Sequence, residues 1–488
     1  MERVAQSTIA PYIAFDRGGE MSYYRQIFLG YRAAILEGRL RPGQRLPSTR
    51  VLARELRISR LPVLNAFEQL LHEGYVVGRV GSGTFVASSL LEKGARAAGS
   101  RLKTTGIRRA QPDGQDGTTR ATDLGPFRVS MPALDQFPHK TWGRLVARHA
   151  RNMSIEMMAY GDPAGYLPLR SAIADYLRTA RAVVCEADQI LIVSGSQMGL
   201  QLCAFALLKP GEEVCVEDPG YPGARQALSI TGATVQPVGV DHEGLLVSAL
   251  GSGKRSPRIV HVTPSHQYPL GMSMTASRRL ELLEWARRQQ SWIIEDDYDS
   301  EYRYASRPLG SLQGMDSHER VIYMGTFSKA IFPALRVGYI VVPQALMKAF
   351  VDFRESLDLF SPTLYQAVLA DFITQGYFGR HVRRMRAIYM SRRDALVEEI
   401  GRRLGDVLDI VNADAGLHLT ALLPQGTDDR EIARRAAERG ISTMPLSAYY
   451  EGKIARGGLV LGFGGSDEKQ IGRAVEKLAQ AIRSASKG

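Results

Sequence analysis

Polar and apolar positions in the first part of the chain repeat with a helical period in three stretches. The longest has apolar residues at every fourth position from Tyr23 to Ile35, which predicts an amphipathic helix. Two shorter helical stretches follow Ser48 and Ser59, and serine is a favoured residue at a helix start. Short β-type runs flank a glycine-rich tip within residues 75–86, which predicts a hairpin. Three helices and a hairpin together predict a winged helix-turn-helix.

The pattern changes twice further along the chain. Residues 88–122 are dominated by Ala, Gly, Ser, Thr, Arg and Gln, a composition that predicts a flexible basic linker. From residue 123 on, short apolar runs are each followed by turn residues, with helical patterns between several of them. Such alternation predicts a buried, mostly parallel sheet, in which ligands lie beyond the carboxyl ends of the strands. We call residues 21–87 the head and residues 123–488 the body.

The net charge of +12 is concentrated before the body. Residues 1–120 contain 19 Lys and Arg against 10 Asp and Glu, whereas the other 368 residues contain 43 against 40. A basic head on a nearly neutral body favours an anionic partner, with nucleic acid the first candidate. The alternative is a solvated basic surface. Charge alone does not distinguish it from a surface that binds nucleic acid.

Composition narrows the class of protein. Hydrophobic residues make up 44% of the 488 positions, enough for a core that needs no disulfide or metal. The three cysteines have no C-x-x-C spacing, so we expect buried thiols in a reduced, cytoplasmic compartment and no metal site. The N-terminus has no apolar signal region, and no run approaches the roughly 18–20 apolar residues that cross a bilayer. We therefore expect no membrane contact.

Polar residues that can take part in binding or catalysis follow several of the apolar runs. Ser196 and Gln197 open a helix after one run, where backbone N–H groups bind anions; the alternative is an ordinary turn. Asp296 and Tyr298 follow another run and suit a ring nitrogen and a ring hydroxyl, with an acidic helix cap as the alternative.

Lys329 follows a third run, in the stretch Gly325-Thr326-Phe327-Ser328-Lys329. A lysine that loses solvation beyond a buried strand becomes nucleophilic at neutral pH, whereas a lysine in a loop is ordinarily a surface charge. Arg336 precedes the next strand and suits a bidentate pair with a phosphate.

Six motifs of the body resemble, in their order, those of the fold-type I aminotransferases. They read S-G-S-Q-M-G-L, E-D-P-G-Y-P-G-A-R, T-P-S-H-Q-Y-P-L-G, I-I-E-D-D-Y-D-S-E, Y-M-G-T-F-S-K and L-R-V-G-Y. From about Gly125 to the C-terminus the chain is similar to the aminotransferase-like domain of MocR/GabR-type regulators. The resemblance implies an α/β fold with a mostly parallel seven-stranded sheet and a smaller α+β domain. It also implies pyridoxal 5′-phosphate (PLP) as the cofactor.

The resemblance assigns a catalytic set around PLP. Lys329 is expected to form an imine with the cofactor, Asp296 to pair with the pyridine nitrogen, and Tyr298 to bind the ring hydroxyl. A protonated pyridine nitrogen makes the ring an electron sink.

The resemblance also implies further cofactor contacts. Tyr221 is expected to stack on the ring and His266 to approach its edge. Tyr160 resembles the tyrosine that reaches the phosphate of a partner subunit, which implies a homodimer with shared sites. Side chains expected around the phosphate are Ser196, Gln197, Ser328 and Arg336.

The head resembles a GntR-type winged helix over residues 43–50, 58–60 and 81–86, so the third helix is expected in the major groove of double-stranded DNA. Winged helices also contact proteins, but the basic excess favours DNA. Arg79, in the hairpin, is expected to reach the backbone or the minor groove. The candidates for base edges are Ser59, Arg60 and Asn65. The candidates for phosphates are Arg45, Ser48 and Arg50.

One departure from the family pattern concerns the ligand. Members that bind an amino-acid carboxylate carry an Arg after a G-F-x pattern near the C-terminus, where this chain reads Gly462-Phe463-Gly464-Gly465. Without that guanidinium a bidentate clamp on a carboxylate is lost. Arg225 is the remaining candidate for a ligand contact. The departure favours PLP itself, or an amine without a carboxylate, as the signal.

Three functions remain open at this point. The first is a transcriptional regulator whose head binds DNA and whose dimeric body senses PLP, an amine or an amino acid through an imine on Lys329. The second is an active PLP-dependent aminotransferase with a fused DNA-binding module; slow half-transamination is compatible with both. The third is a scaffold of the same fold without PLP.

Overall fold

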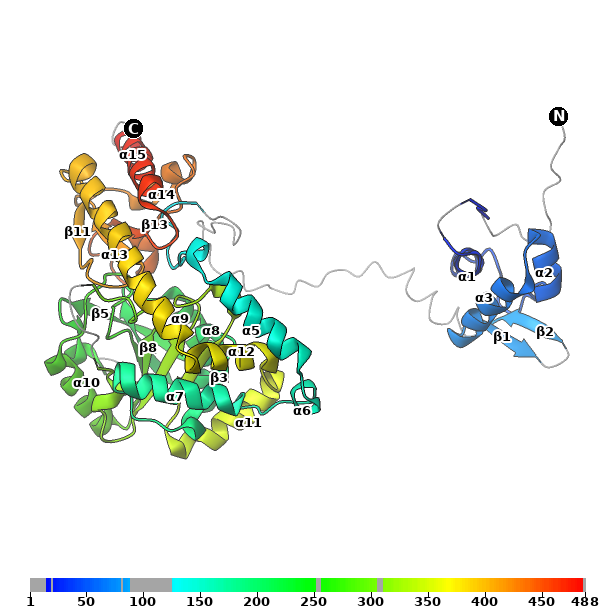
Figure 1. Ribbon diagram of the computed structural model, residues 1–488, viewed down its shortest axis with the longest axis horizontal. Helices are drawn as coiled ribbons and strands as arrows, with labels where there is room; N and C mark the ends of the chain where they lie inside the picture. The colour runs from blue at the N-terminus through cyan, green and yellow to red at the C-terminus, as the bar shows by residue number, and fades with distance from the viewer. Residues whose placement is uncertain are drawn as a thin grey trace. The chain divides into compact units, whose positions relative to one another are not determined.

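The computed structural model describes residues 15–18, 21–79, 82–87, 125–251, 256–304 and 310–485. The chain forms two compact units, residues 1–115 and 116–488, which divide within the predicted linker (Figure 1). The linker expected at 88–122 lies outside the described residues.

The first unit contains the expected winged helix-turn-helix. Three helices precede an antiparallel hairpin in which Val76 pairs with Val86. Every fourth residue of the first helix faces inward, and Tyr31 packs edge-on against Phe67 with 5.6 Å between ring centroids. The Ser48 hydroxyl accepts the backbone N–H of Val51, which caps the second helix. The elements are α1 (Tyr23–Leu36), α2 (Thr49–Leu56), α3 (Arg60–His72), β1 (Val76–Arg79) and β2 (Gly83–Val86).

The body is built around an eight-stranded sheet with the order β3-β10-β9-β8-β7-β4-β5-β6. Seven of these strands form the expected mostly parallel sheet, in which β10 runs antiparallel to β3 and β9. The eighth, β6, adds two residues to one edge. The strands are β3 (Ile190–Val193), β4 (Glu213–Asp218), β5 (Thr234–Asp241), β6 (Gly244–Leu245), β7 (Ile259–Val262), β8 (Trp292–Asp297), β9 (Val321–Thr326) and β10 (Gly338–Val341).

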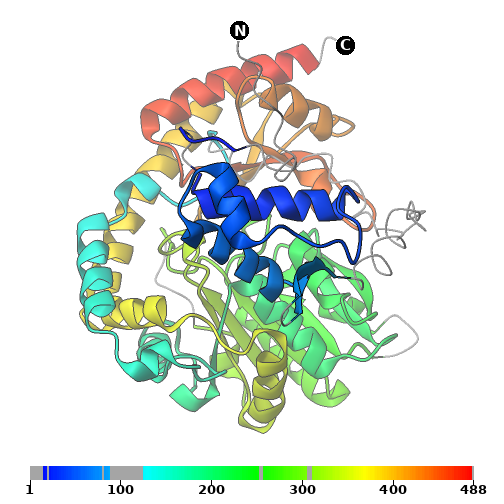
Figure 2. The ribbon, with the colours of Figure 1, turned by 90° about the vertical axis from the view of Figure 1, so that its right-hand side faces the viewer.

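Helices cover both faces of this sheet, which is why its central strands read as continuous apolar runs. Alternate residues of β3 enter different cores: Ile192 packs with α7 and α12, whereas Val193 packs with α8, α9 and α11. Figure 2 shows α5 beside α12 at one side of the body. The helices are α5 (His139–Arg151), α6 (Ile155–Met158), α7 (Leu167–Arg181), α8 (Ser196–Leu207), α9 (Pro222–Leu228), α10 (Ala276–Gln289), α11 (Met347–Asp358) and α12 (Thr363–Thr374).

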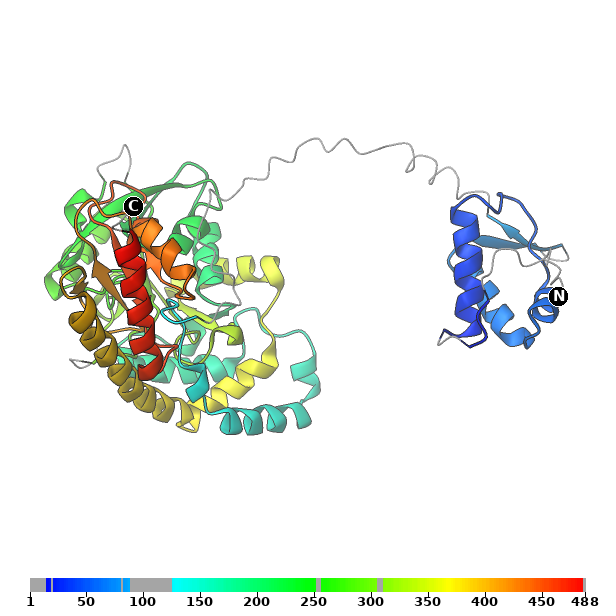
Figure 3. The ribbon, with the colours of Figure 1, turned by 90° about the horizontal axis from the view of Figure 1, so that it is seen from above.

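The C-terminal part forms the expected smaller α+β layer. An antiparallel sheet with the order β11-β12-β14-β13 lies against three helices, and α13 runs beside α15 (Figure 3). Its elements are α13 (Tyr377–Leu404), β11 (Asp409–Val411), β12 (His418–Leu422), α14 (Asp429–Ala437), β13 (Met444–Pro445), β14 (Gly458–Gly462) and α15 (Glu468–Ala485).

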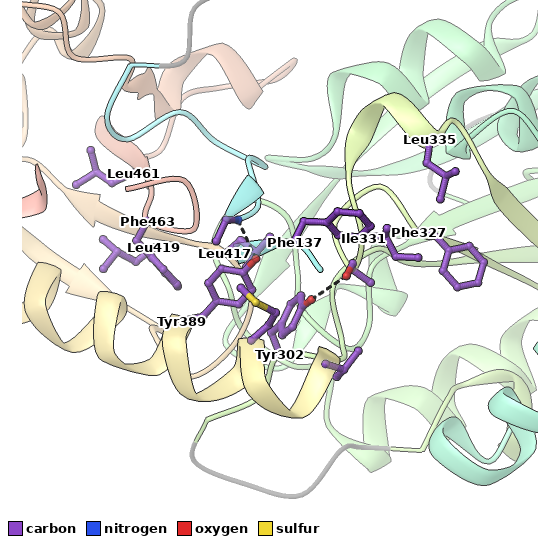
Figure 4. Close-up of a cluster of buried hydrophobic side chains, with 14 of the residues drawn as sticks. Phe137, Tyr302, Phe327, Ile331, Leu335, Tyr389, Leu417, Leu419, Leu461 and Phe463 are labelled. Carbon is purple, nitrogen blue, oxygen red and sulfur yellow. Dashed lines mark hydrogen bonds between the residues drawn. The ribbon is translucent and has the colours of Figure 1, made fainter. Parts of the chain in front are cut away.

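One buried cluster joins the small layer to the large sheet (Figure 4). Leu461 and Phe463 enter it from the small layer, and Phe327 and Ile331 enter it from the loop after β9. Because Lys329 lies between the last two residues, this core fixes the loop that carries it.

Two compositional expectations also bear on the fold. Cys185, Cys203 and Cys215 are all buried and free, as expected. Within the part of the chain that the structure describes, no helix is both long enough and apolar enough to cross a membrane.

Candidate functional site

A cavity of about 330 Å³ opens at the carboxyl ends of β8 and β9. All of its lining residues except Pro333 carry a polar side-chain group, although the strands that lead to it are apolar. Its walls are formed by Ser130, Ser196, Gln197, Tyr221, Thr263, Tyr268, Asp296, Tyr298, Thr326, Ser328, Lys329, Pro333 and Arg336.

Strand register explains why groups far apart in sequence meet there. Gly338 on β10 stands opposite both Val193 at the end of β3 and Thr326 at the end of β9. Arg336, two residues before Gly338, therefore lies at the same edge of the sheet as the loop after β9. In the parallel pair β8 and β9, Asp296 stands opposite Met324, which brings its carboxyl group to that edge.

Lys329 is the amine of this cavity. Burial lowers the pKa of its ammonium group to about 8, and the positive charge of Arg336 acts in the same direction. The carboxylates of Asp299 and Asp296 oppose the shift without cancelling it. A larger fraction of the amine is therefore neutral and nucleophilic at neutral pH than in an exposed lysine.

Ser196, Gly195 and Arg336 form an anion-binding corner of the cavity that also holds Lys329. Ser196 is the first residue of α8, whose N-terminal N–H groups point out of the helix. Arg336 donates to the backbone carbonyl of Ser194. Gly195 has φ +89°, and an added Cβ would lie 3.1 Å from the Arg336 guanidinium, so glycine lets the arginine lie across this turn. The arrangement suits a phosphate.

Asp296 supplies a buried carboxylate to the cavity. Its Oδ2 lies 3.5 Å from Nε2 of His261, and its Oδ1 has no hydrogen-bond partner among the described residues. A buried polar atom without a partner is unusual and points to a missing ligand group. A protonated ring nitrogen is a donor of the right kind.

An aromatic wall closes one side of the cavity. Tyr221 and Tyr268 meet edge-on with 5.9 Å between ring centroids. Gln197 fixes this wall, because its amide donates to the carbonyl of Gly223 at 2.9 Å and its oxygen accepts the Tyr221 hydroxyl at 3.4 Å. Such a wall suits a flat ring.

Tyr298 lines the cavity, whereas His266, expected at the ring edge, lies behind Tyr298. The Tyr298 oxygen is 2.9 Å from Nδ1 of His266, and Oδ1 of Asp299 is 2.9 Å from the same nitrogen. Burial raises the pKa of the Tyr298 phenol well above its usual value, and the charge of Asp299 adds to this. Tyr298 therefore keeps its proton at neutral pH.

Two other expected site residues lie outside the cavity lining. Tyr160 is 86% exposed and contacts Phe360 with 6.1 Å between ring centroids. Arg225 forms an ion pair with Glu451 at 2.8 Å. Neither residue belongs to the lining of the cavity that holds Lys329.

The sequence analysis did not single out five of the lining residues. Thr263 and Tyr268 stand in the motif T-P-S-H-Q-Y-P-L-G, so the motif itself was a signal. Ser130 precedes the sheet and belongs to no motif. The others are Thr326 and Pro333.

The head carries its candidate DNA contacts on exposed positions. Arg60 is held by the Thr49 hydroxyl at 3.0 Å from its Nε. Arg79 lies over the ring of Phe85, 4.9 Å from its centroid. The exposed candidates are Arg45, Ser48, Arg50, Ser59, Arg60, Asn65 and Arg79.

Leu61, next to Arg60, is 65% exposed and was not among the expected contacts. It lies one helical turn before Asn65 on the same side of α3. The sequence places Leu61 directly after Arg60, but only the structure shows that this large apolar side chain is exposed at the start of the predicted recognition helix.

Comparison with known proteins agrees with both units. A model described as bacterial regulatory proteins, gntR family, matches residues 23–86, and one described as aminotransferase class I and II matches residues 134–478. A probable rhizopine catabolism regulatory protein MocR of Rhizobium meliloti is 39% identical over 477 residues, with 96% of each chain covered. The chain belongs to the MocR-type transcriptional regulators. A second member, the pyridoxine biosynthesis transcriptional regulator PdxR of Corynebacterium glutamicum, is 32% identical over 92% of this regulator and 94% of PdxR.

Solved structures resemble the body. Kynurenine aminotransferase of Pyrococcus horikoshii, solved with PMP, has a TM-score of 0.69 and 27% identity over 75% of this chain and 92% of the enzyme. LysN of Thermus thermophilus, solved with a phosphopyridoxyl-leucine, has a TM-score of 0.69 and 26% identity over 74% and 92%. The orphan carboxylate of Asp296, the lysine amine and the anion corner fit the same group. The cofactor of this regulator is PLP.

The lowered pKa of Lys329 makes a prediction for the PLP-free protein. Since the pKa is about 8 against an ordinary 10.5, the neutral fraction at pH 7 is roughly 300-fold larger than in an ordinary lysine. We expect acylation of Lys329, followed by mass spectrometry, to speed up with pH and level off above about pH 8.5. Exposed Lys348 in the same sample is the control and should keep accelerating. A Lys329 rate that climbs in parallel with that of Lys348 would contradict the assignment.

Proposed function

We propose that this regulator acts in the cytoplasm and senses PLP, or an amine bound to PLP, in the cavity around Lys329. Occupancy of the cavity then changes how the head binds DNA. The observation that carries the proposal is the combination, in one cavity, of an activated amine, an anion corner and a buried carboxylate without a partner. These three groups match the aldehyde, the phosphate and the ring nitrogen of PLP.

Each residue has a distinct task in this proposal. PLP supplies an aldehyde and an electron-withdrawing ring. When PLP is bound, the neutral amine of Lys329 would bind the aldehyde, and Asp296 would hold a proton on the ring nitrogen. Tyr298 would donate to the ring hydroxyl oxygen, and Tyr221 would cover the ring face. The residues that would hold the phosphate are Ser196, Gln197, Ser328 and Arg336.

The cations of the cavity favour a signal over a turned-over amino acid. Among the described residues of the lining, the positively charged ones are Lys329 and Arg336, and PLP engages both. Arg225 is committed to Glu451. On the side of the small layer, the lining residue Tyr268 packs against an apolar cluster that contains Val460 and Tyr449 and so supplies no positive charge there. No guanidinium of this lining is left for a ligand carboxylate, as the Gly464-Gly465 departure suggested.

Incubation with amino acids separates this proposal from an active aminotransferase. We expect keto-acid release to stop at about one equivalent per cofactor, because half-transamination consumes the aldehyde and no clamp retains the next substrate. An aminotransferase would sustain release at about 1–1000 per second. Sustained release at such rates from any common amino acid would contradict the sensing role.

The head is proposed to bind DNA through two groups of residues. Ser59, Arg60 and Asn65 face base edges from the start of α3, and Leu61 joins them as an apolar contact. Arg79 reaches the backbone or the minor groove from the hairpin. The phosphate contacts are Arg45, Ser48 and Arg50.

Leu61 gives this interface a specific prediction. An exposed leucine in the major groove has one apolar partner on base edges, the methyl group of thymine. Replacing single thymines of the operator by deoxyuridine removes only that methyl. We expect one position per half-site to weaken gel-shift binding about 5- to 10-fold, a cost of about 1 kcal/mol.

The control for this prediction is the variant Leu61→Ala, which should bind the thymine and the deoxyuridine operators equally. The variant Leu36→Ala removes another exposed leucine of the head, 57% exposed, and should keep the wild-type preference. If Leu61→Ala still discriminates at that position, a different side chain reads the methyl group.

A homodimer with shared sites is also proposed. The segment around Tyr160 lies on the turn between α11 and α12, since an added Cβ at Gly161 would meet the Phe360 ring at 2.8 Å. Exposed apolar side chains gather on both segments, as expected of a face covered by a second subunit. They are Ile155, Met158, Tyr160, Leu167, Phe353, Leu357, Leu359 and Tyr365.

Subunit mixing tests whether Tyr160 completes the site of its partner. Tyr160→Ala and Lys329→Ala should each impair every site of their own homodimers. In a mixed dimer of the two variants, one site receives both defects and the other receives neither. We therefore expect mixing to restore wild-type PLP affinity at half of the sites of the mixed dimers. No restoration would place Tyr160 in the site of its own subunit.

A further inference from the structure

A buried histidine and a buried carboxylate stand behind the cavity without touching it. His266 and Asp299 are 2% exposed each, and neither belongs to the cavity lining. Tyr298, which lines the cavity, links the pair to it, and its ring stacks on His266 with 5.7 Å between centroids.

Hydrogen-bond chemistry fixes where the protons of this group lie. Nδ1 of His266 faces two oxygens: Oδ1 of Asp299 at 2.9 Å and the Tyr298 oxygen at 2.9 Å. A carboxylate only accepts hydrogen bonds, so the hydrogen between Asp299 and His266 belongs to Nδ1. The Tyr298 oxygen then accepts from the same N–H and cannot donate to it.

The consequence is a direction for the phenolic hydrogen. The Tyr298 hydroxyl makes no second hydrogen bond within the described residues, and Tyr298 lines the cavity. Its O–H is therefore directed into the cavity. The neighbouring phenol of Tyr268 is committed elsewhere, because it donates to the Tyr449 hydroxyl at 3.2 Å.

The histidine ring is held in place by its surroundings. An added Cβ at Gly416 would lie 2.1 Å from Cε1 of His266 and 2.5 Å from Oδ2 of Asp299, so only glycine fits there. The ring of His418 on β12 tilts against His266 at 5.1 Å, and burial lowers its pKa to about 3, which leaves it neutral. The charged and titratable groups that face His266 are thus Asp299, Tyr298 and the neutral His418, with Tyr268 and Lys329 beyond them.

We propose that Asp299 and His266 form a positioning pair that fixes the Tyr298 hydroxyl as a hydrogen-bond donor to the ring oxygen of PLP. This inference rests on the proposed PLP site. His266 is a positioning residue, not a cofactor contact. Polarisation by Nδ1–H also makes the phenol a stronger donor, which stabilises the ionised ring oxygen.

The pH titration of the visible absorbance of bound PLP tests the pair. Loss of the donor to the ring oxygen destabilises its ionised form, so the titration midpoint should rise. We expect His266→Leu to raise the midpoint by about 0.5 to 1 pH unit, toward the midpoint of Tyr298→Phe. A shift of this size corresponds to the free energy of about one hydrogen bond. His266→Asn is the matched control, because its amide N–H can occupy the place of Nδ1–H and should restore a midpoint near wild type.

Asp299→Asn gives a second break of the pair if His266→Leu does not fold. Its amide can donate to Nδ1, which moves the ring hydrogen to Nε2 and turns Tyr298 toward the histidine; the midpoint should again rise. PLP uptake with equal midpoints in wild type and His266→Leu would overturn the positioning pair alone. A wild-type protein that takes up no PLP would instead overturn the proposed site.

Discussion

Replacing Lys329 by Ala is expected to abolish the visible absorbance of the PLP-loaded protein. The variant removes the amine that burial activates, while the anion corner and Asp296 remain. PLP then binds only through its phosphate and ring, without a bond to the protein. Absorbance spectra after desalting measure the effect, and borohydride reduction with mass spectrometry shows whether PLP remains attached to the chain.

Lys348→Ala is the matched control, since Lys348 is exposed and pairs with Asp352 at 2.7 Å. It should keep the wild-type spectrum and the attachment. A yellow Lys329→Ala protein that still carries reducible PLP would mean that another lysine anchors the cofactor. A wild-type protein without PLP would support the scaffold reading instead.

Replacing Arg336 by Ala is expected to give the second largest effect, on affinity. A hydrogen bond to a charged group is worth about 1.5–3 kcal/mol, so PLP should bind roughly 10- to 150-fold more weakly. The loss should be confined to the phosphate, because Arg336 lies across Gly195 at the anion corner. Absorbance titrations with PLP and with pyridoxal, which lacks the phosphate, measure this difference.

Pyridoxal is therefore the internal control for Arg336. Its affinity should be nearly equal in wild type and variant. The PLP affinity of Arg336→Lys should fall between those of wild type and Arg336→Ala, because lysine keeps the positive charge but lacks the bidentate donor geometry of a guanidinium. An equal loss for PLP and pyridoxal would show that the variant damages the whole cavity, for example through the loop after β9.

The groups whose shared place in the cavity could be predicted from the sequence are those at the ends of buried strands. Lys329, Asp296 and Arg336 each stand within a few residues of an apolar run, so local order and a parallel sheet sufficed to bring them together. The winged helix was equally accessible, because its three helices have clear periodicity and its turns are short.

The parts that sequence analysis missed depend on long-range contacts. Ser130 reaches the cavity because its segment pairs with β14, through the bridge between Phe127 and Gly462. The ion pair that occupies Arg225 comes from Glu451, more than two hundred residues away. The place of His266 behind Tyr298 depends on glycine at position 416, which no local motif marks.

The central claim is that PLP in the body controls DNA binding by the head. Footprinting upstream of the regulator's own gene and its neighbours, with PLP titrated in, tests this claim most directly. Wild type and Lys329→Ala are compared at fixed salt, since phosphate contacts make affinity salt-dependent. We predict that PLP changes the footprint or the midpoint of binding for wild type and leaves Lys329→Ala unchanged. Identical footprints of wild type with and without PLP would contradict the account.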